Sequence, residues 1–257
     1  MITFDKFKNK YFIEIVITNT SPFHIGSGND SVSPLEPDNS VMKNSRGEVI
    51  IPGSSLKGMF RANTEMIIKT FNQNKVCDET GNSPCIDPKE RKEKTEEEWE
   101  KYIEENICEV CDLYGSNSFA SRIYFSDAFS TNAKISVKDG IKIRRDTEVT
   151  FDKGKFDYEI VEPGAEFKTD ILLENAEDYH IGYVIMIIEM VNSGIVKIGG
   201  KKSAGLGNLK IEYKIKKLTF EDIENGIFSP EYVDENFTEI IKKETKNHLK
   251  ALKVGDN

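Results

Sequence analysis

The spacing of apolar side chains predicts a strand, a loop, a second strand and a long helix in the first part of the chain. Residues 11–19 and 49–52 are rich in β-branched and aromatic side chains, which favour strands. Residues 20–48, between them, are rich in Ser, Asn and Pro and predict a long loop. Residues 54–73 predict a helix because apolar side chains recur there at helical spacing: Leu56, Met59, Phe60, Met66 and Ile67.

The rest of the chain predicts further strands interrupted by polar insertions. Residues 74–111 are irregular, with a short helix predicted at 93–105. We expect a strand at 121–129, a hairpin arm at 134–170, more strands with a short helix among 170–173, 182–192 and 207–216, and one or two polar helices at 220–252, broken at Ser229-Pro230. This order is typical of a ferredoxin-like or RRM-like α+β core whose long insertions carry the function.

The turn before the long helix combines groups that suit a phosphate. Pro52-Gly53 ends the second strand, and Ser54 or Ser55 is placed to cap the helix. Amide groups at a helix start favour an anionic oxygen, and Lys57 and Arg61 lie one turn apart. An ordinary capped helix, with a solvated Lys57 and an Arg61–Glu65 pair, fits the same residues equally well.

All four cysteines fall within one irregular region: Cys77, Cys85, Cys108 and Cys111. A C-x-x-C pair places two thiolates on one metal ion, and the other two cysteines complete a tetrahedral set. Soft thiolates in a reducing compartment favour a structural zinc ion. A thioredoxin-like redox pair is the alternative, but four clustered cysteines and the missing βαβ context disfavour it. The region contains no histidine and no H-x-E element, so catalytic zinc of the deaminase kind is disfavoured.

Length and composition are those of a globular protein with one sizeable core or two small ones. The chain has 257 residues, of which 38% are apolar and 10% aromatic. No apolar run approaches the length of a membrane span, so we expect no membrane partner. Residues 1–10 lack the apolar core of a signal peptide, so we expect a cytoplasmic protein with reduced cysteines.

The net charge of −9 argues against broad electrostatic affinity for nucleic acid. The charges are unevenly spread, however, because the acidic residues concentrate at 90–105 and 221–244. Residues 197–217 hold seven lysines against the single Glu212. A local basic stripe suits a groove dedicated to one strand of nucleic acid. The exposed face of a strand is the other interpretation of these lysines.

Five segments, in the same order, resemble the RAMP superfamily, specifically the backbone subunits of type III CRISPR RNA-guided effector complexes. They are the strand at 12–17 with the His-Ile-Gly loop at 22–28, the segment at 38–43, the Ile-Pro-Gly-Ser-Ser-Leu-Lys-Gly turn at 51–58, residues 111–115 with 120–128, and the glycine-rich loop at 198–207. The resemblance implies a RAMP (RRM-like) domain at 1–217, with a zinc-binding Cys-rich insertion at 74–111 and a projecting thumb at 134–170. Residues 218–257 form a polar helical extension outside it.

The resemblance also implies a function. It implies a subunit that binds guide CRISPR RNA, assembles with copies of itself and with other effector subunits, and cuts the paired target RNA in antiviral defence. The implied catalytic residue is Asp38, with Mg²⁺ or a similar divalent ion. The implied RNA contacts are His24, Gly26, Ser54, Ser55, Lys57, Arg61, Lys201, Lys202 and Ser203, with Arg144 and Arg145 on the thumb. Arg144 and Arg145 are equally placed to make salt bridges with Asp146 and Asp157.

The cleavage residue is open to alternatives. Cutting RNA through its own 2′-hydroxyl needs an in-line geometry and a base or a metal ion, and a mobile loop carboxylate provides either. Asp30 and Glu36 lie near Asp38, and Asp38 also suits an Asx turn. A catalytically silent RNA-binding subunit is therefore the alternative function. A repeat-processing endonuclease of the same superfamily is the third, which the scattered histidines disfavour.

Overall fold

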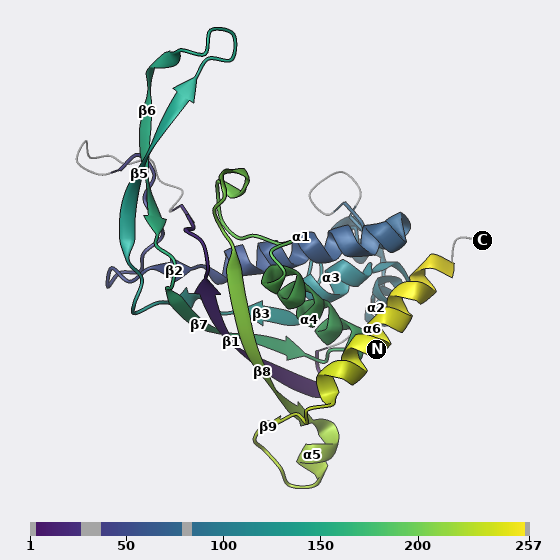
Figure 1. The fold of residues 1–257 in the computed structure, drawn as a ribbon. Helices are drawn as coiled ribbons and strands as arrows, with labels where there is room; N and C mark the ends of the chain where they lie inside the picture. The colour runs from purple at the N-terminus through teal and green to yellow at the C-terminus, as the bar shows by residue number, and fades with distance from the viewer. Residues whose placement is uncertain (1–3, 27–36, 79–83, 255–257) are drawn as a thin grey trace.

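One seven-stranded antiparallel sheet organises the chain (Figure 1). This computed structural model describes residues 4–26, 37–78 and 84–254. The longest strands are β1 (Asn9–Asn19), β7 (Glu166–Glu174) and β8 (Leu209–Thr219), and β1 lies between the other two. The shorter strands are β2 (Ile50–Ile51), β3 (Ile123–Phe125), β4 (Ala128–Phe129) and β9 (Glu231–Tyr232). Along the sheet the order is β2-β4-β7-β1-β8-β9, with β3 also paired to β7.

Three helices cover one face of the sheet: α1 (Gly53–Phe71), α4 (Asp178–Asn192) and α6 (Phe237–Val254). Strand β1 shows why, because Tyr11, Ile13, Ile15 and Ile17 alternate with partly exposed residues and are buried beneath these helices. The shorter helices α2 (Glu96–Asn106) and α3 (Glu109–Tyr114) lie in the polar region between α1 and β3. The α+β class predicted from the sequence is confirmed.

Residues 182–192, one of three segments expected to supply strands with a short helix among them, belong to helix α4 (Asp178–Asn192), which is longer than that helix was expected to be. The segment is apolar on nearly every side, and its residues from His180 to Ile185 are all buried. It lies among α1, α6 and β8, and such a fully buried helix lacks the polar face that reveals a helical period. The apolar run alone therefore did not distinguish this helix from a buried strand.

Two other elements differ from their predicted bounds. The strand predicted at 121–129 is divided into β3 and β4 by Ser126 and Asp127. The C-terminal region contains α5 (Phe220–Glu224), β9 and α6, with the break near Ser229 that the sequence predicted. Helix α6 is polar in composition, but it packs against the main hydrophobic core through Ile241, Leu249 and Leu252.

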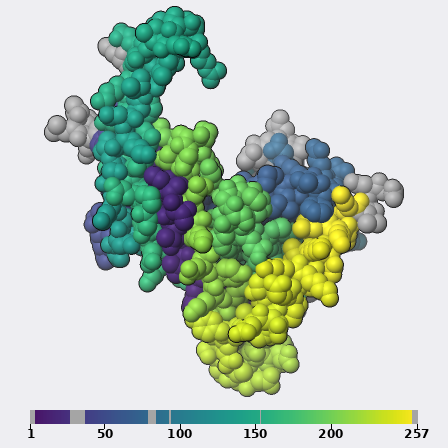
Figure 2. All heavy atoms as spheres, in the orientation of Figure 1, coloured from purple at the N-terminus to yellow at the C-terminus, as the bar shows by residue number. Residues whose placement is uncertain are grey.

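A two-stranded hairpin projects from the sheet (Figures 1 and 2). Its strands are β5 (Ile135–Ile143) and β6 (Thr150–Val161), and we call them the thumb hairpin. The arm predicted at 134–170 is shorter than expected, because residues 166–170 pair with β1 in the main sheet. The outer part of the hairpin is exposed, including several apolar side chains: Ile141, Ile143, Val149 and Phe151.

Within the described residues, no helix is long and apolar enough to cross a membrane.

Candidate nucleic-acid interface and metal centre

The start of α1 is capped differently from the prediction. Pro52 is the N-cap residue and makes no side-chain cap, whereas Ser54 and Ser55 lie inside the first turn. The first amide, of Gly53, donates to Asp127 Oδ1 at 2.7 Å. Gly53 also approaches the β3–β4 turn so closely that a Cβ would lie 2.3 Å from Phe125 O. The predicted serine cap was therefore wrong, and the Asp127 carboxylate accepts the hydrogen bond of the Gly53 amide instead.

Lys57 and Arg61 share one face of α1 as predicted, and that face packs against the protein. Lys57 Nζ donates to Ser121 Oγ at 3.0 Å, and burial, followed by the charge of Arg61, lowers the pKa of this lysine. Arg61 donates to Gly115 O at 2.9 Å and pairs with Glu65 at 3.0 Å. Phosphate contact by these two cations stays a prediction.

The glycine-rich loop is built onto the His-Ile-Gly segment. Gly200 N donates to His24 O at 2.8 Å. Gly199 has φ +81°, and a Cβ there would lie 2.3 Å from the same oxygen, so the close approach requires glycine. His24 is buried, and its Nδ1 lies 2.7 Å from Glu159 O. The two segments named from sequence thus form one structure, with the His24 ring directed to the thumb hairpin.

Between this loop and α1 lies a pocket of about 380 Å³. Ser55 and Lys202 both line it, so the structure brings these two predicted contacts together. The remaining lining residues are Ile25, Gly58, Met59, Ala62, Asn63, Ile198 and Gly199. Ser54 and Ser203 are exposed outside this pocket. We call this pocket and the glycine-rich loop the groove.

Lys201 makes a different contact from its neighbour. Its Nζ lies 4.2 Å from the centre of the Tyr158 ring and 4.6 Å from that of Phe156, both on β6. Lys201 itself has a left-handed backbone with φ 55°. The glycine-rich loop is therefore fastened to the base of the thumb hairpin by a cation over two aromatic rings.

Asp38 is exposed and lies against the thumb hairpin. Its amide donates to Asp157 Oδ1 at 2.8 Å, and its Oδ2 accepts from the Asp157 amide at 3.2 Å. The same segment reaches the groove, since Gly26 bridges to Val41 and Met42 N donates to Ile25 O at 2.8 Å. The competing carboxylates Asp30 and Glu36 lie outside the described residues.

Arg144 and Arg145 lie at the tip of the thumb hairpin and are exposed. The Arg144 guanidinium stacks over the Phe151 ring at 5.0 Å. The carboxylate of Asp157, which we considered as an arginine partner, bonds to the Asp38 amide instead. Both arginines are thus available to a partner at the far end of the hairpin.

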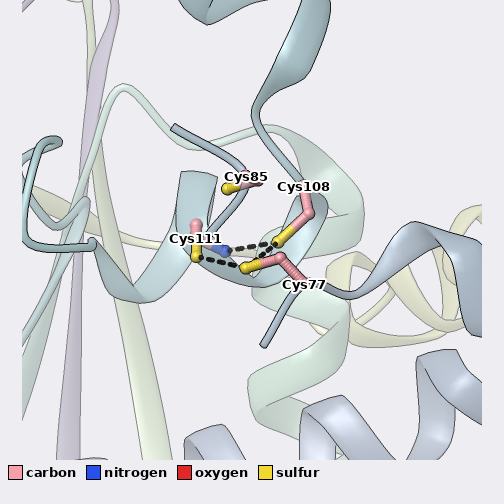
Figure 3. A group of neighbouring side chains, drawn as sticks. All are labelled: Cys77, Cys85, Cys108 and Cys111. Atoms are coloured by element: carbon pink, nitrogen blue, oxygen red, sulfur yellow. Dashed lines mark hydrogen bonds between the residues drawn. The ribbon is translucent and has the colours of Figure 1, made fainter. Parts of the chain in front are cut away.

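The four cysteines converge although 34 residues separate the first from the last (Figure 3). Their sulfur atoms all lie within 4.8 Å of one another, and none of the four is in a disulfide. Cys77 Sγ is 3.5 Å from Cys111 Sγ and 3.6 Å from Cys108 Sγ. A tetrahedral zinc ion with Zn–S bonds of about 2.3 Å separates its sulfur ligands by roughly 3.8 Å. The cluster therefore fits a metal ion of this kind.

Cys108 is the thiol arranged to ionise, whereas hydrogen bonding to Cys108 raises the pKa of Cys85 and Cys111, and burial raises the pKa of Cys77. Cys108 caps helix α3, where its Sγ accepts from the Cys111 amide at 3.5 Å. Hydrogen bonds from Cys111 and Cys85 lower the pKa of Cys108 below its ordinary value. Arg61 Nη2, 3.6 Å from Cys111 Sγ, adds positive charge beside the cluster. A thiolate is the form that binds a metal ion.

Helix α3 also holds a buried polar cluster that sequence reasoning missed. Asp112 Oδ1 accepts from Arg122 Nε at 2.7 Å. Glu109 accepts from Tyr183 at 2.6 Å and lies 3.0 Å from His248 Nε2. The signal was present as charged residues flanking Cys111, but their partners lie just before β3 and on the more distant α4 and α6. The cysteine-bearing helix thereby joins the core to the C-terminal helix.

Comparison with known proteins identifies the family. Residues 16–210 match the model of the RAMP superfamily. The chain belongs to the RAMP superfamily. This RAMP protein is 26% identical over 216 residues to the CRISPR system Cms endoribonuclease Csm3 of Methanocaldococcus jannaschii, and the alignment covers 79% of each chain. The family named from the sequence is thereby confirmed.

Proposed function

We propose that this RAMP protein is a backbone subunit of a type III CRISPR effector complex, which binds guide RNA and cuts paired target RNA at Asp38. The name of the Methanocaldococcus relative, an endoribonuclease of a CRISPR system, supports both parts. The observation that carries the proposal is the position of Asp38. Its exposed carboxylate lies on a segment bonded to the groove on one side and to the thumb hairpin on the other.

We infer that the core is ferredoxin-like, as in RRM domains. The strands β8, β1, β7 and β3 follow one another across the sheet, and α1 and α4 connect them in the order strand, helix, strand, strand, helix, strand. The antiparallel pairing of β1 with both β7 and β8 agrees with this fold. The groove, the cysteine region and the thumb hairpin are then insertions on a common scaffold.

Guide binding is assigned to the groove. Ser55 and Lys202 line it, and the exposed Ser203 adjoins it. Close packing of Gly199 against His24 fixes the shape of the loop, and Lys202 supplies positive charge. Such contacts with phosphate position RNA without reading its sequence. A subunit that serves any guide requires this property.

Cleavage is assigned to Asp38 acting on the 2′-hydroxyl of the target nucleotide. A carboxylate within hydrogen-bond reach removes that proton as a general base, or holds a divalent cation with a hard oxygen ligand. Mg²⁺, when bound, would stabilise negative charge on the phosphate. The thumb hairpin, pushing between nucleotides, would present the phosphate in line with the attacking oxygen.

We assign a structural zinc ion to Cys77, Cys85, Cys108 and Cys111. Four sulfur donors without an open position are typical of structural sites. The ion would hold together a region that is mostly polar and exposed. The partners of this RAMP protein would be further copies of the chain and other effector subunits, and we expect the complex to be cytoplasmic.

The test is cleavage of complementary labelled RNA by the assembled complex with Mg²⁺, with and without Asp38→Ala. Cutting by the wild type and none by the variant supports the proposal. A wild type that binds target and never cuts identifies the catalytically silent subunit instead.

A further inference from the structure

The segment that carries Asp38 runs along strand β6 of the thumb hairpin. Asn39 forms a parallel bridge with Tyr158, and its carbonyl accepts from Glu159 N at 2.9 Å. Val41 N donates to Glu159 Oε2 at 2.9 Å, and Lys43 Nζ pairs with the same carboxylate at 3.1 Å. These contacts make the described part of the loop, from residue 37 on, an added edge of the hairpin.

Asp157 holds Asp38 itself. Its carboxylate accepts from the Asp38 amide at 2.8 Å, while its amide donates to the Asp38 carboxylate at 3.2 Å. The first bond fixes the backbone of Asp38, and the second fixes the direction of its side chain. Two like charges gain nothing from lying side by side, so the two backbone amides are what stabilises the arrangement.

We propose that Asp157 is the positioning residue for Asp38, so that the thumb hairpin and the cleaving carboxylate move as one unit. The inference rests on the proposed function. Cleavage needs the carboxylate aligned with a phosphate that the thumb hairpin distorts, and an error of about 1 Å in such an alignment can cost roughly 100-fold in rate. Fastening the carboxylate to the hairpin removes that error.

The hairpin offers a matched control. Asp139 lies directly across from Asp157 on strand β5, and its carboxylate pairs with Lys155 Nζ at 3.5 Å. Both aspartates carry the same charge on the same projecting element. Replacing Asp139 therefore removes a charge from this place without removing the bond to Asp38.

The experiment measures single-turnover cleavage and target affinity in the assembled complex for Asp157→Ala, Asp157→Asn and Asp139→Ala. We expect Asp157→Ala to slow cleavage by roughly 10-fold to 100-fold with unchanged affinity, because alignment acts on the rate. Asp157→Asn keeps an oxygen that accepts from the Asp38 amide, so it should cut at nearly the wild-type rate, as should Asp139→Ala.

Two kinetic outcomes overturn the inference. Equal losses of cleavage rate in Asp157→Ala and Asp157→Asn would mean that the charge of Asp157 acts in the chemical step, rather than its oxygen in positioning Asp38. Wild-type cleavage by Asp157→Ala would make the contact dispensable. Asp38→Ala, measured alongside, separates failure of the proposed function from failure of this inference. If Asp38→Ala cuts normally, the proposed function fails, whatever the result for Asp157.

Hydrogen exchange provides a readout that does not depend on cutting. Amides of residues 38–43 should exchange faster in Asp157→Ala than in the wild type, Asp157→Asn or Asp139→Ala. Unchanged exchange in Asp157→Ala would overturn the inference even in a complex that never cleaves.

Discussion

Lys201 and Tyr158 join two parts of the molecule that are distant in sequence. The lysine ammonium lies 4.2 Å from the centre of the tyrosine ring, which is itself packed edge-on against His24. Lys202, the next residue, lines the groove instead. The two adjacent lysines thus make different contacts, since Lys201 packs the loop against the thumb hairpin and Lys202 lines the groove.

This division predicts a specific effect on RNA binding. Lys202→Ala should weaken guide binding equally for all sequences and reduce the slope of log K against log salt by roughly 0.7 to 1, as expected for one lost phosphate contact. Lys210→Ala is the control, because Lys210 is exposed on β8, on the sheet face that the helices leave open. Filter binding at several salt concentrations measures both. An unchanged slope for Lys202→Ala would show that Lys202 contacts no phosphate and that guide RNA does not bind in the groove.

The cysteine cluster predicts about one zinc ion per purified chain. Cys111→Ser should lose the metal and lower the unfolding temperature, because binding free energy contributes directly to folding. The buried Cys111 also contacts Arg61, so we expect helix α1 to loosen with it. Elemental analysis and a chelator titration monitored by circular dichroism test this. Far less than one metal ion per chain, with stability insensitive to chelator, would contradict the assignment.

Two helical glycines should respond to alanine in opposite directions. A Cβ on Gly182 of α4 would lie 1.6 Å from Thr245 Oγ1 on α6, so Gly182→Ala should destabilise the fold by roughly 1–3 kcal/mol. Gly58 on α1 has nothing within 4 Å of that position, so Gly58→Ala should stabilise it by about 0.5–1 kcal/mol. Denaturant unfolding of both variants gives the comparison. A Gly182→Ala variant as stable as the wild type, or more stable, would mean that α4 and α6 are not packed this closely.

His180 predicts a loss of stability in acid. It is fully buried, its Nδ1 accepts from the Glu177 amide at 3.2 Å, and burial, followed by the charge of Arg122, lowers its pKa to about 3. The unfolded chain takes up this proton near pH 6.5 and the folded chain does not, so the contribution is complete above that pH and is lost as pH falls. We expect a decrease of about 2 kcal/mol between about pH 7 and pH 5.

Nuclear magnetic resonance measures the same residue directly. The His180 ring signals should stay constant from about pH 8 to pH 5. A titration midpoint near 6.5 would show that the ring reaches solvent or that Asp112, 3.4 Å from its Nε2, holds its proton.

The sequence predicted well those features that depend on local pattern. The alternation in β1, the long helix after Gly53 and the four cysteines within one polar region are visible in short stretches of chain. Helix α4 was not assigned to its segment because a segment buried on all sides has no polar face to show its period. The α1 cap was missed because Asp127, which bonds to Gly53, lies 74 residues later.

The candidate site shows the same limit. Asp38 was found through resemblance, and its partner Asp157 was not, because 119 residues separate them and only the fold brings them together. The direction of Lys57 and Arg61 was likewise open until α3 and β3 were in place, since helical spacing gives the shared face but not what that face contacts.

Asp38 is the most direct test of the whole account. Cleavage of complementary RNA should be measured with wild type, Asp38→Ala and Asp38→Asn, because the asparagine keeps an oxygen that accepts from the Asp157 amide while losing the charge. The account predicts that both variants bind guide and target with nearly wild-type affinity. It also predicts that neither variant cuts the target to a measurable extent within the assay. Wild-type cutting by Asp38→Asn would contradict it.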